Sequence, residues 1–179
     1  MIIEAETGKT VADAFITRIY GPMGMNDTSW GAADLPLPFS HGYTRQTPDE
    51  SRADAYNWDP SWSDAAGQLV STVQDMRKWA RTLANPVLIS PAMHAERIKW
   101  VTLPGSSPSY GLGIGKAGSW YHHQGSIPGY NTIALYLPEL EATVVVLSNS
   151  DTSHDNNNPA AAMWLAVSAV LSPEYTPGR

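Results

Sequence analysis

Several features are missing from this chain of 179 residues. It has no cysteine, which excludes disulfide bonds, a thiolate nucleophile and a zinc site with cysteine ligands. No apolar run approaches the roughly 18 residues that span a bilayer, and no basic segment followed by an apolar one opens the sequence. Positive charge is scarce, since 11 Lys and Arg residues face 17 Asp and Glu residues, a formal net charge of -6. The sequence therefore indicates neither a membrane segment nor a nucleic-acid partner.

Familiar catalytic motifs are missing as well. The sequence contains no Gly-x-Ser-x-Gly, no Ser-x-x-Lys and no Gly-rich phosphate loop. It also lacks the His-Glu-x-x-His and calcium-loop patterns. Nucleotide chemistry and simple metal chemistry thereby lose their usual sequence support.

What is present indicates a folded globular chain of about one domain. Hydrophobic residues make up 42% of the sequence and charged residues 16%. This balance allows a packed core and argues against disorder.

Residues 1–104 carry mainly helical patterns. The apolar spacing of the first 19 residues predicts two short helices separated at Thr7-Gly8. Residues 21–62 are rich in Gly, Pro, Asp, Asn and Trp without a sustained period, which predicts a long ordered loop.

Two further helices are predicted before residue 104. An apolar pattern that starts at Leu69 predicts a long helix with an internal N-cap at Thr72 and Asp75 at its third position. The pair Ser90-Pro91 predicts the start of another helix, which we expect to end near Val101.

Residues 105–179 change to the two-residue period of β-strands. Strands are expected over residues 110–114, 131–137 and 142–147, the last two joined as an antiparallel hairpin. The last strand is apolar on both faces, so both faces need cover. We expect an apolar helix over residues 160–171 on one face, and on the other either the helix near Thr72 or polypeptide outside this sequence. The pattern predicts an α+β fold.

The sequence allows two interpretations of the neighbouring histidines His122 and His123. Only His122 and His123 lie beside a cluster of glycines, and successive residues of a strand face opposite sides, so they cannot both serve one site. Either one of them has a role in a site, or one is exposed and the other packed. Asp151, His154 and Asp155 are better explained as a polar loop before the last helix than as a metal cluster. We therefore expect no metal ion and no cofactor.

The segment from Trp120 to Tyr130, WYHHQGSIPGY, resembles the third active-site motif of the penicillin-recognising serine hydrolases. In that superfamily the motif is Lys or His, any residue, then Gly, which here is His123-Gln124-Gly125. The Pro-Gly-aromatic turn that follows resembles the branch of class C β-lactamases, DD-peptidases and esterases. Five other segments agree with the branch in its order, so the resemblance covers essentially the whole chain: residues 1–8, 22–28, 66–79, 110–113 and 144–149.

The motif has a physical interpretation. A glycine on an edge strand lets a substrate backbone approach, and the residue two positions earlier faces the same side. Such a strand can pair with an extended substrate and donate a main-chain N–H to a developing oxyanion. The resemblance implies that His123, Gly125 and the main-chain N–H of Ser126 belong to the catalytic site, with His123 holding a substrate carboxylate or tuning the proton network around the nucleophile.

Three further residues are candidates for substrate binding, namely Gln124, Tyr130 and Trp120. The two aromatic residues have an alternative interpretation, because aromatic side chains near strand ends commonly pack in cores.

The resemblance also indicates what this sequence does not carry. In the family a Ser-x-x-Lys supplies the nucleophile and its activating lysine, and a Tyr-x-Asn precedes the segment that matches Ile2-Ile3-Glu4. Neither motif occurs in the 179 residues. We therefore expect the C-terminal part of a β-lactamase/transpeptidase-like α+β fold, with a remnant of the helical region over residues 1–104 and the sheet region over 105–179, incomplete without the N-terminal half.

Two functional hypotheses follow. The first is a serine hydrolase that works through an acyl-enzyme on a β-lactam, a D-alanyl peptide or a small ester, and that is inactive as this chain alone. Its partners would be that small molecule and either the N-terminal half of the same enzyme or a second copy. The second is a non-catalytic binding or interaction module that retains the fold. Members of the family are often exported or periplasmic, but no signal occurs here, so the compartment is left open.

Overall fold

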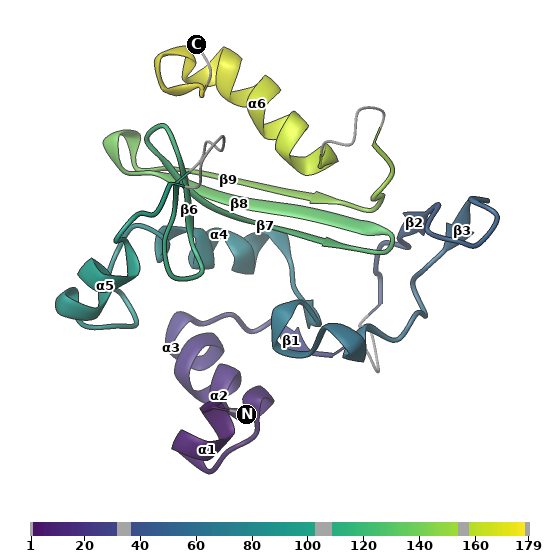
Figure 1. Ribbon diagram of the computed structural model, residues 1–179, viewed down its shortest axis with the longest axis horizontal. Helices are drawn as coiled ribbons and strands as arrows, with labels where there is room; N and C mark the ends of the chain where they lie inside the picture. Colours follow the sequence, from purple (N-terminus) through teal and green to yellow (C-terminus); the bar gives the residue numbers. More distant parts are fainter. Residues whose placement is uncertain (1, 32–36, 103–108, 154–157, 178–179) are drawn as a thin grey trace.

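The computed structural model describes residues 2–31, 37–102, 109–153 and 158–177. A five-stranded antiparallel sheet in the order β5-β6-β7-β8-β9 forms its centre. Helix α6 (Pro159–Leu171) covers one face and helix α4 (Val73–Arg81) covers the other, as Figure 1 shows. The strands are Ser109–Tyr110, Gly115–Ala117, Trp120–Ile127, Tyr130–Leu137 and Ala142–Ser148.

Tight connections fix the register of the three long strands. Pro128 and Gly129 form a two-residue turn between β7 and β8, and Gly129 has a φ of 85°, which a glycine adopts without strain. A short 3-10 helix, Pro138–Leu140, connects β8 to β9. Strand β9 packs against α4 on one face and against α6 on the other. This confirms the expectation that both of its apolar faces are covered.

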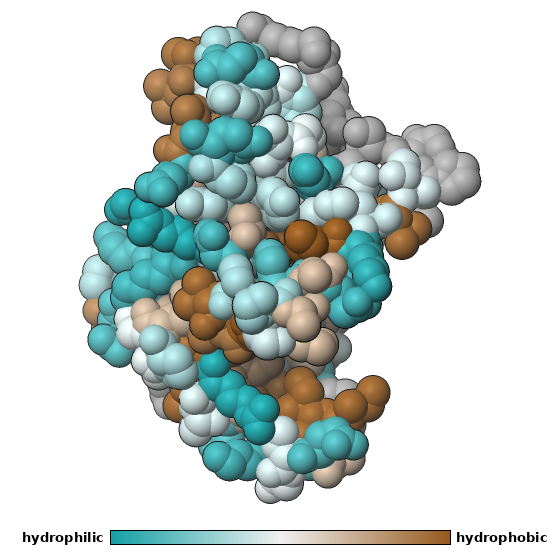
Figure 2. All heavy atoms as spheres, turned by 90° about the vertical axis from the view of Figure 1, so that its left-hand side faces the viewer, coloured by the Kyte–Doolittle hydropathy of each residue, from teal (hydrophilic) through white to brown (hydrophobic). Residues whose placement is uncertain are grey.

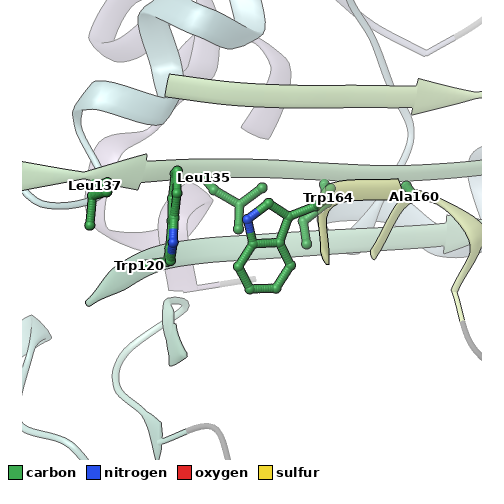
Figure 3. Packing of buried hydrophobic residues seen from close by; sticks show 6 residues of the cluster. Trp120, Leu135, Leu137, Ala160 and Trp164 are labelled. Atoms are coloured by element: carbon green, nitrogen blue, oxygen red, sulfur yellow. The ribbon is translucent and has the colours of Figure 1, made fainter. Parts of the chain in front are cut away.

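The face of the sheet under α6 carries the larger apolar cluster. Trp120 of β7 and Trp164 of α6 meet edge to face, with ring centroids 6.0 Å apart. Ile133, Leu135 and Leu137 of β8 complete this layer (Figure 3). The alternation of a strand puts the even-numbered residues of β7 and the odd-numbered residues of β8 on this face.

The opposite face packs on α4. Ala80 and Leu83 contribute to a buried cluster with Ile114 and with Ala134 of β8. Residues from both sides of position 104 therefore share one cluster, and the division of the chain at 104 stays a prediction.

The remaining helices lie below the sheet or at its side in Figure 1. None of the helices that the structure describes is long and apolar enough to cross a membrane. The chain starts with α1, α2, a π-helix and α3, and α5 precedes the sheet; their bounds are Ile2–Thr7, Val11–Phe15, Ile16–Tyr20, Gly21–Met23 and Pro91–Arg97.

The segment predicted as a long ordered loop is built from short pieces. Strands β1 (Ser29–Trp30), β2 (Tyr43–Thr44) and β3 (Ala53–Asp54) lie in it, and a 3-10 helix, Pro60–Ala66, begins at its end. Strand β2 pairs with β3, and β1 pairs with β4 (Leu69–Val70), which follows the segment. Another 3-10 helix, Pro173–Tyr175, follows α6.

A buried carboxylate joins this lower part to α4. Asp75 is 1% exposed and accepts hydrogen bonds from the Asp27 N–H at 2.8 Å, the Thr28 hydroxyl at 2.9 Å and the Lys78 ammonium at 2.7 Å. Lys78 also donates to the Gly24 carbonyl, so it connects α4 to the segment that follows α3. Burial opposes ionisation, but these hydrogen bonds outweigh it and hold the pKa of Asp75 below its ordinary value.

Local signals were reliable where caps are concerned. Thr72 accepts from the Asp75 N–H as N-cap of α4, and Ser90 accepts from the Met93 N–H ahead of α5. Gly8 has a φ of 63° after α1, as the predicted helix break requires.

The long helix begins where its internal N-cap predicts, after Thr72, and Leu69 lies ahead of it in strand β4. Two other expectations about element bounds were wrong. Helix α5 ends at Arg97 and not near Val101. Residues 110–114 do not form one strand, because β5 ends at Tyr110 and the chain turns before β6. In that turn the Gly111 N–H donates to the Ile114 carbonyl, while the Ile114 side chain enters the cluster under α4.

Candidate functional site

The outer edge of β7 is open over its second half. Strand β6 pairs with β7 only from Ala117↔Trp120 to Gly115↔His122, whereas β8 pairs with β7 as far as Ile127↔Tyr130. Among the described residues no strand pairs with this edge beyond His122. The open edge, residues 123–127, contains the glycine of the motif.

The register determines which main-chain groups face this edge. A two-residue hairpin turn is flanked by a pair that exchanges both of its hydrogen bonds, here Ile127 and Tyr130, and such pairs alternate along an antiparallel ladder. The N–H groups of Ile127, Gly125 and His123 therefore point toward β8. Those of Gln124 and Ser126 point outward. The Ser126 N–H, the expected oxyanion donor, therefore faces the open edge.

Gly125 packs too closely on β8 for a side chain. A Cβ atom at this position would lie 2.8 Å from the Thr132 hydroxyl, a distance that would force the threonine to move. With glycine at this position, no side chain projects from β7 beside the open edge, where an extended substrate could approach.

His123 is exposed and hydrogen-bonded to a tyrosine. Its Nε2 lies 2.8 Å from the Oη of Tyr110, which comes from β5. His123 and Gly125 share one face of β7, the face toward α4, by the alternation of the strand. The sequence resemblance found His123, but no local signal indicated that Tyr110 would reach it.

His122 lies on the opposite face, with its ring stacked near Trp164 at a centroid distance of 6.3 Å. Among the described residues neither of its ring nitrogens has a hydrogen-bond partner. Burial, and to a smaller extent the charge of His123, lowers the pKa of His122 to about 4. Of the two neighbouring histidines, His123 is therefore exposed and His122 is packed against the α6 side of the sheet.

Gln124 and Ser126 are exposed, and their side chains project from the α6 face, away from that of His123. The Ser126 hydroxyl accepts a hydrogen bond at 3.0 Å from the buried amide of Asn131. That amide also donates to the Tyr130 carbonyl at 2.9 Å. The side chain of Ser126 is thereby tied to β8, while its main-chain N–H faces the open edge.

The two aromatic candidates occupy different surroundings. Trp120 is 2% exposed, and its indole N–H donates to the Tyr175 carbonyl at 3.1 Å, which favours its alternative interpretation as a core residue. Tyr130 donates to the Ser40 carbonyl at 2.9 Å, and burial raises its pKa above the ordinary value. Tyr130 therefore holds the loop around residue 40 against the β7–β8 turn.

That loop brings a histidine and a carboxylate to the turn, and sequence reasoning did not single them out. His41 Nδ1 and Asp54 Oδ2 lie 2.6 Å apart, and this hydrogen bond is the main cause that lowers the pKa of Asp54. Residues 13 positions apart carry no spacing signal for such a pair. Gly42 packs closely on Gly129, since Cβ atoms at these positions would come within 2.9 Å of the facing main chain.

Metal ligands do not gather in the part of the chain that the structure describes, where no group of three or more His, Cys, Asp or Glu residues could hold an ion. Asp151 accepts hydrogen bonds from Thr44 at 2.7 Å and Gln46 at 2.5 Å. His154 and Asp155, its suggested neighbours, lie outside the described residues.

Comparison with known proteins gives a consistent picture. A family model described as "Beta-lactamase" matches residues 1–168. An unguisins hydrolase of Aspergillus campestris (strain IBT 28561) is 26% identical, with 90% of this chain and 33% of the relative covered.

Solved structures agree with this match. A D-amino acid amidase from Ochrobactrum anthropi SV3 is 28% identical with a TM-score of 0.76, covering 97% of this chain and 55% of that one. A D-stereospecific amidohydrolase from Streptomyces sp. is 22% identical with a TM-score of 0.82, covering 96% and 51%. The chain thus spans about half the length of these structures and about a third of the curated relative. Its sheet and covering helices have the same fold as theirs.

Proposed function

Because the chain belongs to the beta-lactamase family of hydrolases, we propose that it is the C-terminal part of a serine hydrolase that works through an acyl-enzyme. The open edge of β7 would form one side of the acyl-transfer site. The observation that carries this proposal is the outward direction of the Ser126 N–H beyond the point where β6 ends.

Each group at this edge has a proposed task. The Ser126 N–H would donate to the oxyanion that develops when a nucleophile attacks the substrate carbonyl. Gly125 would allow the substrate backbone to lie against the strand, and His123 would bind a polar group of the substrate on the same side. The nucleophile and its activating lysine would come from polypeptide outside these 179 residues, because the chain has no Ser-x-x-Lys.

The substrate class proposed is a β-lactam, a D-alanyl peptide or a small ester. Two structural relatives are named for amide hydrolysis with D-configured substrates, and the curated relative is named a hydrolase of unguisins. These names favour an amide over an ester within the proposed class.

Completion by the N-terminal half of the same enzyme is supported by the surface around α6. This helix is apolar on more than the side that packs on the sheet, and Val170 and Leu171 are 79% and 76% exposed. Figure 2 shows apolar atoms at the top of the molecule, where α6 lies. Strand β9, at the end of the sheet, has an outer edge with no partner strand among the described residues over Ala142–Ser148. A further strand and helix would fit these two surfaces.

A pair of substitutions at one position tests the catalytic proposal. In the enzyme completed with its N-terminal half, Ser126→Pro removes the outward N–H without breaking a main-chain hydrogen bond to β8, as proline is tolerated at such edge positions. It also removes the hydroxyl that accepts from Asn131, a loss that Ser126→Ala shares. Turnover is expected to fall by about 10²–10³-fold. Ser126→Ala keeps the N–H and is the matched control, with activity expected within a few-fold of the parent. Equal activity of both variants would overturn the role of the N–H.

Covalent labelling tests the division of the site between two polypeptides. A fluorophosphonate probe is expected to label the N-terminal half in the completed enzyme and to leave this chain unlabelled when it is alone. A label attached to a serine of this chain would contradict the proposal.

The alternative function is a non-catalytic binding or interaction module. The exposed apolar residues of α6 are the observation that favours it. Size in solution separates the two functions, since a monomer that binds little hydrophobic dye argues against an interaction module.

A further inference from the structure

Tyr110 of β5 is the residue that reaches the exposed histidine of the motif. Its Oη lies 2.8 Å from Nε2 of His123, and the two ring centroids are 6.1 Å apart. Tyr110 is 45% exposed, so burial of its ring does not explain why it lies against His123. The proposed function assigns a task to His123 and none to Tyr110.

The main chain around Tyr110 is held on both sides. Tyr110 and Val101 exchange two hydrogen bonds, each 2.9 Å long. The Leu112 N–H donates to the Arg97 carbonyl at 2.9 Å, and a side chain on Gly111 would collide with the same carbonyl. The phenol is therefore presented to His123 from a fixed piece of backbone.

The hydrogen bond has two chemically different forms. Either the phenol donates to Nε2, or the Nε2–H of the imidazole donates to the phenol oxygen. A phenol O–H is the stronger donor of the two, and an imidazole nitrogen is the stronger acceptor. The O–H to Nε2 form joins the stronger donor to the stronger acceptor, and it leaves the proton of the neutral ring on Nδ1.

We propose that Tyr110 is a positioning residue that fixes neutral His123 as the Nδ1–H tautomer, so that His123 presents a hydrogen-bond donor at its other nitrogen. As far as it concerns a substrate, this inference rests on the proposed function. A donor at Nδ1 suits a substrate acceptor, such as a carbonyl or carboxylate oxygen lying along the open edge of β7. A substrate ammonium group would find no acceptor on such a ring.

Nitrogen-15 NMR of the histidine rings of this chain tests the inference. At about pH 8.5, His123 is expected to show a protonated Nδ1 and an unprotonated Nε2. Tyr110→Phe removes only the hydroxyl and is expected to shift the tautomer ratio about tenfold toward Nε2–H, or about 1.4 kcal/mol. Tyr56→Phe is the matched control, because Tyr56 packs on a different histidine, His41, with ring centroids 4.4 Å apart. This substitution is expected to leave the tautomer ratio of His123 unchanged.

Two results would overturn the inference. One is a protonated Nε2 at His123 in the parent chain, a measurement that needs no variant to fold. The other is an unchanged ratio in a folded Tyr110→Phe chain. Neither result depends on whether a nucleophile is supplied from elsewhere, so failure here is distinct from failure of the labelling experiment.

Discussion

His122 should make the folded chain sensitive to mild acid. Its ring is partly buried between β6 and α6, close to Trp164. The ring also occupies the space beside Gly115, where a Cβ atom would lie 2.6 Å from its Nε2. Protonation would place a charge in this apolar site, and among the described residues no group accepts a hydrogen bond from either ring nitrogen.

The magnitude follows from the change in pKa. Burial lowers the pKa of His122 from 6.5 to about 4, while the unfolded chain keeps the higher value. As the pH falls below 6.5, the unfolded state takes up a proton that the folded state refuses, so stability declines until the pH reaches about 4. The gap between the two values corresponds to about 3 kcal/mol of unfolding free energy, which is present above pH 6.5 and lost through this window.

Chemical denaturation at a series of pH values measures the effect. The unfolding free energies of the parent and of His122→Phe should diverge by about 3 kcal/mol between pH 6.5 and 4, with the variant less sensitive. Carboxylates titrate equally in both chains, so the difference isolates His122. His123→Phe is the control and should keep most of the slope, because desolvation is a larger cause of the His122 shift than the charge of His123. Parallel curves for the parent and His122→Phe would refute the reasoning.

Two stability predictions concern the contacts that join the lower part of the molecule to the sheet. Asp75→Asn removes the charged partner of Lys78, an ammonium that is 43% exposed, and should cost about 1–2 kcal/mol in urea unfolding at pH 7. Asp27→Asn, at an exposed side chain nearby, should cost less than about 0.5 kcal/mol, and equal losses would contradict this account. Gly42→Ala drives a methyl group into the Tyr130 ring and should cost about 1–3 kcal/mol. Gly67→Ala is its control, because a Cβ there meets its nearest neighbour at an ordinary 3.6 Å, and a Gly42→Ala chain as stable as this control would show that the loop moves freely.

The parts of the fold that depend on neighbouring residues could be predicted from the sequence. Thr72 and Ser90 cap α4 and α5 with side-chain oxygens that bond main-chain N–H groups three residues on, and a cap needs nothing more distant. The alternation of residues 131–137 and the Val-rich run of residues 142–147 likewise predicted β8 and β9.

Distant contacts decided what the sequence did not show. The alternation of Tyr110, Leu112 and Ile114 resembles a strand, but Gly111 lies against the Arg97 carbonyl and Ile114 is drawn under α4, so the chain turns instead. Trp120 packs on Trp164 of α6, a contact that the sequence around Trp120 does not indicate. In each case the partner lies too far along the chain to leave a local pattern.

This turn also explains why the candidate site is open. Because Ile114 is anchored in the core, β6 begins only at Gly115, opposite His122, and cannot continue along β7. The five residues from His123 to Ile127 remain beyond its end, and at about 3.3 Å per residue they offer an edge of roughly 16 Å. The same turn brings Tyr110 next to His123. One buried isoleucine thus sets both the length of the free edge and the neighbour of its histidine, which makes the turn at residues 111–114 as important to the site as the motif itself.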